Sequence, residues 1–166
     1  MIGAEFTGHA LPTALGPLNS EDFVAVEVAI FGPEGAKLKL SIEDFTLRIN
    51  GKKQPSAAQS HILTYSSLKD PEYEAPEPAA QKSKGGIKTG GGGGGGEQGA
   101  PPPSPPPIPI EVRRAMQQRI QKAALPAGER ALPQAGLVFY QHRGKVSSAE
   151  LIYNGPAGQC TLRIAP

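Results

Sequence analysis

A stretch of 40 residues, from Asp70 to Pro109, is the feature that most constrains how this chain folds. It contains an uninterrupted glycine run at 90–96 and a proline-rich run at 101–109. Glycine runs form flexible coils, and proline runs form stiffer polyproline II rods. The stretch has too little apolar surface to offset an ordering entropy of about 1–2 kcal/mol per residue. We therefore predict that 70–109 is a disordered Gly/Pro-rich insertion.

The parts on either side of the insertion are each too small to fold alone. Residues 20–69 and 110–166 each hold about 50 residues, near the size below which a core fails without disulfides or metals. Together they reach the length of one immunoglobulin-like domain, about 100 residues. We therefore predict one discontinuous domain over 20–166, made of 20–69 and 110–166, and a flexible segment over 1–19.

Before the insertion, apolar and polar residues alternate as they do in half-buried strands. Residues 23–31 give the strongest signal, because four β-branched residues share one face there: Val24, Val26, Val28 and Ile30. Asn50-Gly51 suits the type I′ turn of a hairpin. The pattern predicts strands at 23–31, 38–42 and 45–49, and short strands at 52–54 and 62–65.

After the insertion, the period changes to that of a helix and then returns to that of strands. Residues 111–124 place Val112, Met116 and Ile120 on one face, as an amphipathic helix does. We expect this helix to cap one end or an open edge of the domain. Alternation then predicts strands at 136–141, 149–153 and 160–164.

The number and spacing of these strands indicate the fold class. Three or four strands before the insertion and three after it, joined by short turns, are spaced as in a sandwich rather than in βαβ units. We predict an all-β fold: an immunoglobulin-like antiparallel β-sandwich of about seven strands, with one short helix and the insertion.

Four segments carry a resemblance to a known family: VAVEVAIF (24–31), DFTLRINGKK (44–53), LPAGE leading to GLVFY (125–140), and ELIYNGPAGQCTLRI (150–164). Together they resemble a bacterial immunoglobulin-like β-sandwich family, mostly exported or lipid-anchored, whose members largely lack an assigned activity. The resemblance covers both parts of the domain but not the insertion. It implies a setting in the periplasm, in the cell envelope or outside the cell, and it supplies no catalytic residues. Residues 1–20 lack the basic and apolar regions of a signal peptide.

Composition argues against several classes of partner. Lys and Arg number 17 against 15 for Asp and Glu, a balance that does not favour nucleic-acid binding. No apolar run approaches the roughly 20 residues of a membrane span. The single cysteine, Cys160, allows no intrachain disulfide and no cysteine-based zinc site. We therefore predict no nucleic-acid partner and no membrane span.

The residues that could carry chemistry are scattered. His9, His61 and His142 form no i, i+4 pair, so a metal site would need carboxylates brought in across the fold. The glycine run matches G-x-G-x-x-G, but polar, proline-rich residues stand where a dinucleotide site has a strand and a helix. Cys160 alternates with apolar residues, as a small core residue does. The sequence therefore predicts no catalytic residue, metal ligand or cofactor.

Two hypotheses about function remain. The first is a non-catalytic module, not an enzyme, that has a structural role or binds another protein through a sandwich face, an edge strand or the P-x-x-P pattern of the proline tract. The pairs Glu21-Asp22 and Glu43-Asp44 then have solvated or capping roles at turns, and the arginines of 111–124 form a solvated face. The alternative is a small-ligand-binding protein or metal-dependent enzyme whose site lies at one end of the sandwich. It predicts a polar pocket with His61 or His142 near carboxylates.

Overall fold

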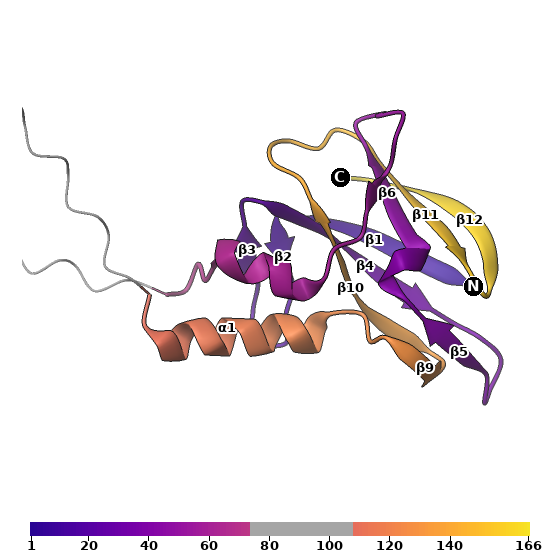
Figure 1. The fold of residues 1–166 in the computed structure, drawn as a ribbon, viewed down its shortest axis with the longest axis horizontal. Coiled ribbons are helices and arrows are strands. Elements are labelled where there is room, and N and C mark those ends of the chain that lie inside the picture. The colour runs from indigo at the N-terminus through magenta and orange to yellow at the C-terminus, as the bar shows by residue number, and fades with distance from the viewer. Residues whose placement is uncertain (74–107) are drawn as a thin grey trace, which may run out of the picture.

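Two antiparallel sheets face each other across one hydrophobic core (Figure 1). The computed structural model describes residues 1–73 and 108–166. One sheet has the order β1-β4-β10 and the other the order β12-β11-β6-β7. Each sheet joins residues from both sides of the insertion. Their strands are β1 (Ile2–Gly8), β4 (Phe23–Ile30), β10 (Gln134–Gln141), β12 (Gly158–Ile164), β11 (Ala149–Gly155), β6 (Phe45–Ile49) and β7 (Ser56–Ala57).

The alternation seen in the sequence builds the core between these sheets. In β4, the four β-branched residues from Val24 to Ile30 that share one face are at most 2% exposed. Across the gap, β6 and β11 pair in register, with Leu47 opposite Leu151, and both side chains are buried. We call this the inter-sheet core. It also contains Leu40, Phe45, Ile49, Leu125, Val138, Tyr140, Ala149, Tyr153 and Ile164.

A second core lies on the other face of the β1-β4-β10 sheet, and we call it the helix-side core. The sheet contributes Ala25, Leu137 and Phe139, and α1 (Ile110–Ala123) contributes Met116 and Ile120. The remaining elements on this side are η2 (His61–Ser67), a 3₁₀ helix, and a small sheet of β2 (Ala10–Leu11), β3 (Leu18–Ser20) and β8 (Leu68–Lys69). The predicted helix is therefore confirmed, but it covers a sheet face rather than an end or edge.

The connection after α1 lies directly on β10. The Leu125 N–H donates to the Leu137 carbonyl at 2.9 Å. A Cβ added at Gly136 would lie 2.5 Å from Leu125 Cα, so a larger residue there would push the connection away. After this connection, β9 (Gly128–Ala131) pairs with β5 (Lys37–Leu40). The short 3₁₀ helix η1 (Ile42–Asp44) follows β5.

The mostly β prediction is confirmed, and several of its details are corrected. The described residues form twelve strands rather than about seven. The expected flexible segment at 1–19 is wrong, because β1 pairs along β4 from Ile2 to Gly8. Residues 62–65 are helical rather than extended. The return strand is β7, not 52–54, although Asn50 and Gly51 have the positive φ angles, 51° and 66°, of the predicted turn.

The predicted insertion at 70–109 is shortened at both ends. The Asp70 carboxylate accepts a hydrogen bond from Arg119 at 2.6 Å, and Ile108 packs against the helix-side core. The rest of the predicted insertion, 74–107, lies outside the described residues. In the described part of the chain, no helix is long and apolar enough to cross a membrane.

Candidate functional site

The structure places the three histidines in different settings. His61 begins η2, with its ring centroid 5.9 Å from that of Tyr65. His9 follows β1, and His142 follows β10. Cys160 is a free, partly buried thiol in β12 that packs against the inter-sheet core. Within 1–73 and 108–166, no three His, Cys, Asp or Glu side chains are grouped to hold a metal ion.

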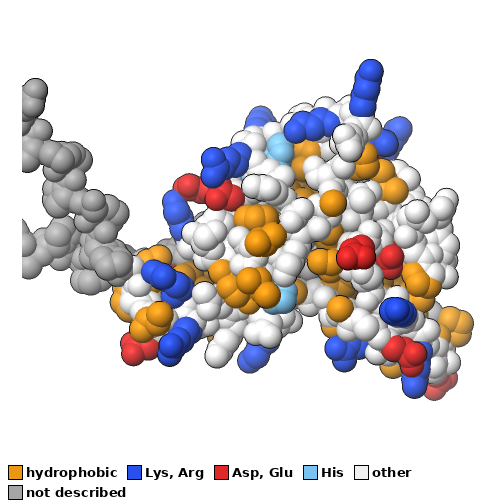
Figure 2. All heavy atoms as spheres, viewed as in Figure 1, with side chains coloured by type: hydrophobic (Ala, Val, Ile, Leu, Met, Phe, Trp, Pro, Cys, Tyr) orange, Lys and Arg blue, Asp and Glu red, His pale blue; other side chains and the backbone are white. Residues whose placement is uncertain are grey.

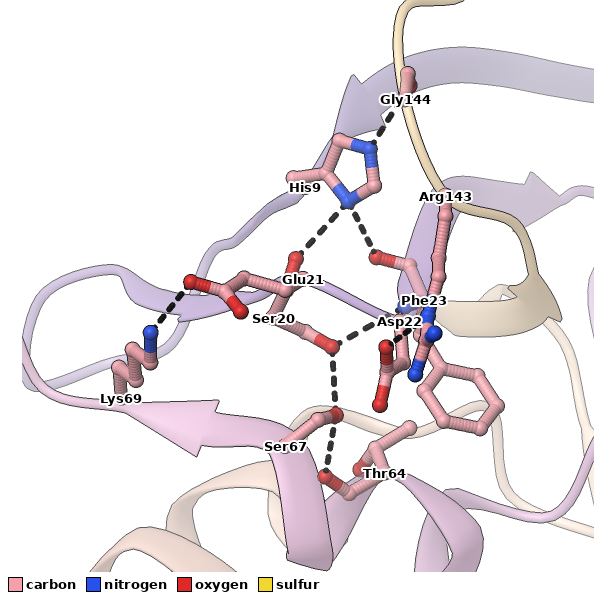
Figure 3. Close-up of polar contacts among 10 residues, drawn as sticks. All are labelled: His9, Ser20, Glu21, Asp22, Phe23, Thr64, Ser67, Lys69, Arg143 and Gly144. Atoms are coloured by element: carbon pink, nitrogen blue, oxygen red, sulfur yellow. Dashed lines mark hydrogen bonds and ion pairs between the residues drawn. The ribbon is translucent and has the colours of Figure 1, made fainter.

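His9 joins three segments of backbone (Figure 3). Its Nδ1 lies 2.8 Å from the Ser20 carbonyl oxygen and 3.0 Å from that of Phe23, and its Nε2 lies 3.1 Å from the Gly144 carbonyl oxygen. Both ring nitrogens thus face carbonyl acceptors, and the neutral ring has one N–H to donate, at the nitrogen that the tautomer sets. The arrangement fastens the end of β1 to the β3–β4 turn and to the β10–β11 loop, and it leaves no nitrogen directed at a nucleophile.

Below His9, a chain of hydroxyl groups links β3 to η2 (Figure 3). The Ser20 and Ser67 Oγ atoms are 2.7 Å apart, the Phe23 N–H donates to Ser20 Oγ, and Ser67 Oγ donates to the Thr64 carbonyl. The neighbouring carboxylates are both paired, Glu21 with Lys69 and Asp22 with Arg143. The hydroxyl groups of Ser20, Thr64 and Ser67 each have a partner, so this network stabilises the junction.

Arg119 fastens α1 to two segments that precede it in the sequence. Its guanidinium donates to Asp70 at 2.6 Å, to Thr13 Oγ1 at 3.2 Å, and to the carbonyl oxygens of Leu15 and Gly16 at 3.0 Å each. The side chains of Arg119 and Asp70 are only 13% and 14% exposed. With all these donors engaged, Arg119 holds the helix in place rather than facing a ligand.

A groove of about 580 Å³ runs between η2, the end of α1 and the β9–β10 region. We call it the η2 groove. Phe139, Leu125 and Pro126 form part of its apolar lining, and its charged lining residues, Lys122 and Arg130, are both positive. A second groove of about 620 Å³ shares Lys122 and Leu137 with it. The two grooves therefore flank the last turn of α1.

Two large apolar side chains lie exposed in η2, the helix that borders the η2 groove. Ile62 is 60% exposed and Leu63 is 52% exposed. Figure 2 shows hydrophobic side chains gathered over this part of the molecule. Buried Thr64 marks the inward face of this helix, and its Oγ1 donates to the His61 carbonyl at 2.6 Å within the same helix. Together with the η2 groove, Ile62 and Leu63 form what we call the η2 surface.

Sequence reasoning missed the η2 surface for a physical reason. The segment HILTYSS contains apolar residues in a polar, serine-rich stretch, and its residues 62–65 are predicted above as a short strand. A 3₁₀ helix turns Ile62 and Leu63 outward instead, because successive residues are about 120° apart. The adjacency of Ile62 and Leu63 was the available signal, since neighbouring residues do not share a face in a strand.

Comparison of the chain with family models, with curated proteins and with solved structures gives no match.

Proposed function

We propose that this protein is a non-catalytic module that binds a segment of another protein on the η2 surface. The observation that carries the proposal is the exposure of Ile62 and Leu63, 60% and 52%, beside a groove of about 580 Å³. Fully burying such a side chain is worth about 1.5–3 kcal/mol. Exposed apolar residues next to a groove therefore supply the anchor that a peptide segment needs.

The charges of the η2 groove define the chemistry of the partner. Lys122 and Arg130 are the charged residues in its lining, and in the described part of the chain neither forms an ion pair with a carboxylate. A complementary segment carries Asp or Glu beside its apolar anchor, because opposite charges across an interface favour binding and select the partner.

The catalytic alternative has less support. It requires His61 or His142 beside carboxylates. The charged groups that act on the pKa of His142, however, are Lys52 and His9, and neither is a carboxylate. The hydroxyl groups of Ser20 and Ser67 bond each other and the backbone. A binding role, in contrast, needs only the exposed apolar residues and the groove of the η2 surface.

The finer fold assignment and the cellular setting are also proposals. The face-to-face packing of two antiparallel sheets supports an immunoglobulin-like β-sandwich. The resemblance of 24–31, 44–53, 125–140 and 150–164 supports a role in the periplasm, in the cell envelope or outside the cell. Fractionating the natural host into cytoplasm, envelope and medium tests the setting. Recovery of the full-length protein from the cytoplasm alone would overturn it.

Selection of peptides from a random display library tests the binding proposal. We expect the wild-type protein to enrich peptides that combine a large apolar residue with Asp or Glu. The double variant Ile62→Ser/Leu63→Ser should lose at least tenfold in affinity for them, and Lys122→Glu should weaken the acidic ones. Phe31→Ser, at a partly exposed apolar site outside the η2 surface, and Lys39→Glu, on β5, are the matched controls.

Two outcomes would contradict the proposal. One is equal enrichment by the wild type and by Ile62→Ser/Leu63→Ser. The other is sedimentation of the wild type as a dimer that this double variant abolishes, which would assign the η2 surface to a second copy of the chain.

A further inference from the structure

Away from the η2 surface, two loops are fastened together as one platform. They are the β6–β7 loop, 50–55, and the β10–β11 loop, 142–148. The Asn50 side chain donates to the Lys145 carbonyl at 3.1 Å and accepts from the Ser147 N–H at 2.7 Å. The Asn50 N–H also donates to the Ser148 carbonyl at 2.9 Å. The two loops therefore lie side by side.

This platform carries positive charge without its own counterions. The two loops contain Lys52, Lys53, Arg143 and Lys145, and neither contains Asp or Glu. Arg143 pairs with Asp22, whereas within the described ranges the three lysines form no ion pair. Figure 2 shows Lys and Arg side chains gathered at the upper edge of the molecule, where the labelled ribbon of Figure 1 places these loops.

His142 lies within this platform with one ring nitrogen unsatisfied. Its Nε2 is buried and has no hydrogen-bond partner among the described residues, although the His142 backbone N–H donates to the Asp22 carbonyl at 2.9 Å. Burial lowers the pKa of His142 and the charge of Lys52 lowers it further, whereas a hydrogen bond with the Lys145 backbone opposes them and His9 adds a smaller lowering effect. His142 is therefore a titratable group that responds to the charges of this platform.

We propose that this platform binds a phosphoryl group, with Lys52 and Lys145 as its counterions and His142 as the titratable group beside them. A phosphoryl group has about two negative charges and three acceptor oxygens, so it can bind cations from both loops, whereas a single carboxylate brings one charge. His9 is the other charged group that acts on the pKa of His142. The carboxylates of Asp22 and Glu21, on the β3–β4 turn, are already paired.

The site is independent of the η2 surface, so either proposal can fail alone. Binding of a phosphoryl group at this platform should change the protonation of His142. A dianion beside His142 favours the charged imidazolium, opposing the effects of burial and of Lys52. Ligand binding should therefore raise the midpoint of the His142 titration, and protonation of His142 should in turn strengthen ligand binding.

Nuclear magnetic resonance on the full-length protein tests the proposal, with inorganic phosphate and phosphoserine titrated separately at constant ionic strength. We expect saturable shifts of the Lys52, His142 and Lys145 signals and a higher His142 titration midpoint at saturation. Tighter binding of phosphoserine would identify a phosphate ester as the ligand, and tighter binding of inorganic phosphate would identify the free ion.

Lys52→Ala/Lys145→Ala should weaken phosphate binding at least tenfold, and His142→Gln should abolish the linked rise in titration midpoint. Lys37→Ala/Lys39→Ala, on the exposed β5 strand, is the control and should leave the dissociation constant unchanged. Amide spectra confirm that each variant is folded. Linear shifts that chloride reproduces, or an unchanged dissociation constant in Lys52→Ala/Lys145→Ala, would overturn the proposal.

Discussion

The two faces of the β1-β4-β10 sheet are covered in different ways. Toward the second sheet, β4 presents four β-branched side chains from Val24 to Ile30 to long, regular strands. Toward α1, the same strand presents Ala25, and the covering layer is assembled from a helix, a 3₁₀ helix and three short strands. A small side chain at Ala25 leaves room for these elements to approach the sheet.

One face of the sheet therefore supplies most of the stability, and the other supports the surface that we propose for binding. The inter-sheet core is continuous and is formed by strands from both sides of the insertion. The helix-side layer buries Met116 and Ile120 but leaves Ile62 and Leu63 exposed beside a groove. Irregular elements supported by a rigid scaffold are where binding residues are most often found.

The largest effect is expected in the inter-sheet core. Phe45 is fully buried, with its ring centroid 5.0 Å from that of Tyr153. Phe45→Ala should lower the free energy of unfolding by about 3–5 kcal/mol, because it removes the ring and leaves a cavity. Urea denaturation measures this loss, and Phe31→Ala, at a 44% exposed position, serves as the control. A loss below about 1 kcal/mol would mean that the sheets are not the main source of stability.

A smaller and more local effect is expected where Arg119 joins α1 to the rest of the helix-side layer. Arg119→Met leaves the largely buried Asp70 carboxylate without its partner, and we expect a loss of about 2–3 kcal/mol. Hydrogen exchange should quicken in α1 and the β2–β3 loop while β4 and β10 stay protected. The exposed Arg114 of the same helix, as Arg114→Met, is the matched control. Uniform loss of protection across both sheets would show that the two cores unfold as one unit.

The two cores also differ in how far the sequence reveals them. Strict alternation predicted β4, β6 and β11, because each buries one face along its whole length. The helix-side layer contains strands of two or three residues, β2, β3 and β8, and no period can be recognised over so few positions. Local pattern therefore predicts the inter-sheet core and the helix, but not the small sheet.

The candidate sites could be predicted only in part, for a related reason. Lys52 and Lys145 are 93 positions apart in the sequence, and Asn50 brings their loops together through contacts that no local pattern encodes. Likewise, His9 was notable as a titratable residue, but its three carbonyl partners come from segments as distant as Gly144. Sequence identified the residue types, and the tertiary fold determines which of them meet.

Shortening the insertion should have an effect of about 1 kcal/mol, in the stabilising direction. Replacing 74–107, most of the insertion predicted from the sequence, by about ten Gly/Ser residues shortens the connection by nearly two doublings, each worth about 0.6 kcal/mol of closure entropy in a flexible chain. Thermal unfolding should show an equal or higher Tm. A replacement that begins at Asp70 instead removes the partner of Arg119 and should lower Tm. If both replacements gave the same Tm, the Asp70 contact would contribute nothing.

The buried hydroxyl groups of the two cores give a paired prediction. Tyr140 Oη is buried in the inter-sheet core without a partner among the described residues, and burial raises the pKa of Tyr140. Tyr140→Phe should therefore be neutral or stabilising by up to about 1 kcal/mol. Thr64→Val, which removes the bond to the His61 carbonyl, should destabilise by about 1 kcal/mol. Destabilisation by Tyr140→Phe would show that the hydroxyl has a partner in solution, such as a buried water.

The smallest effect concerns the pH dependence of stability, through His142 at the rim of the inter-sheet core. Burial, then Lys52, lowers the pKa of His142 below its ordinary value of 6.5. The unfolded chain therefore binds a proton more readily than the folded one, so the free energy of unfolding falls as pH drops below 6.5 and is unaffected above it. Urea denaturation at pH 7.5 and pH 5.5 should show a smaller pH effect in His142→Gln than in the wild type. Phosphate should reduce the wild-type effect, because a bound dianion stabilises the charged ring. An identical pH effect in both proteins would remove His142 as its source.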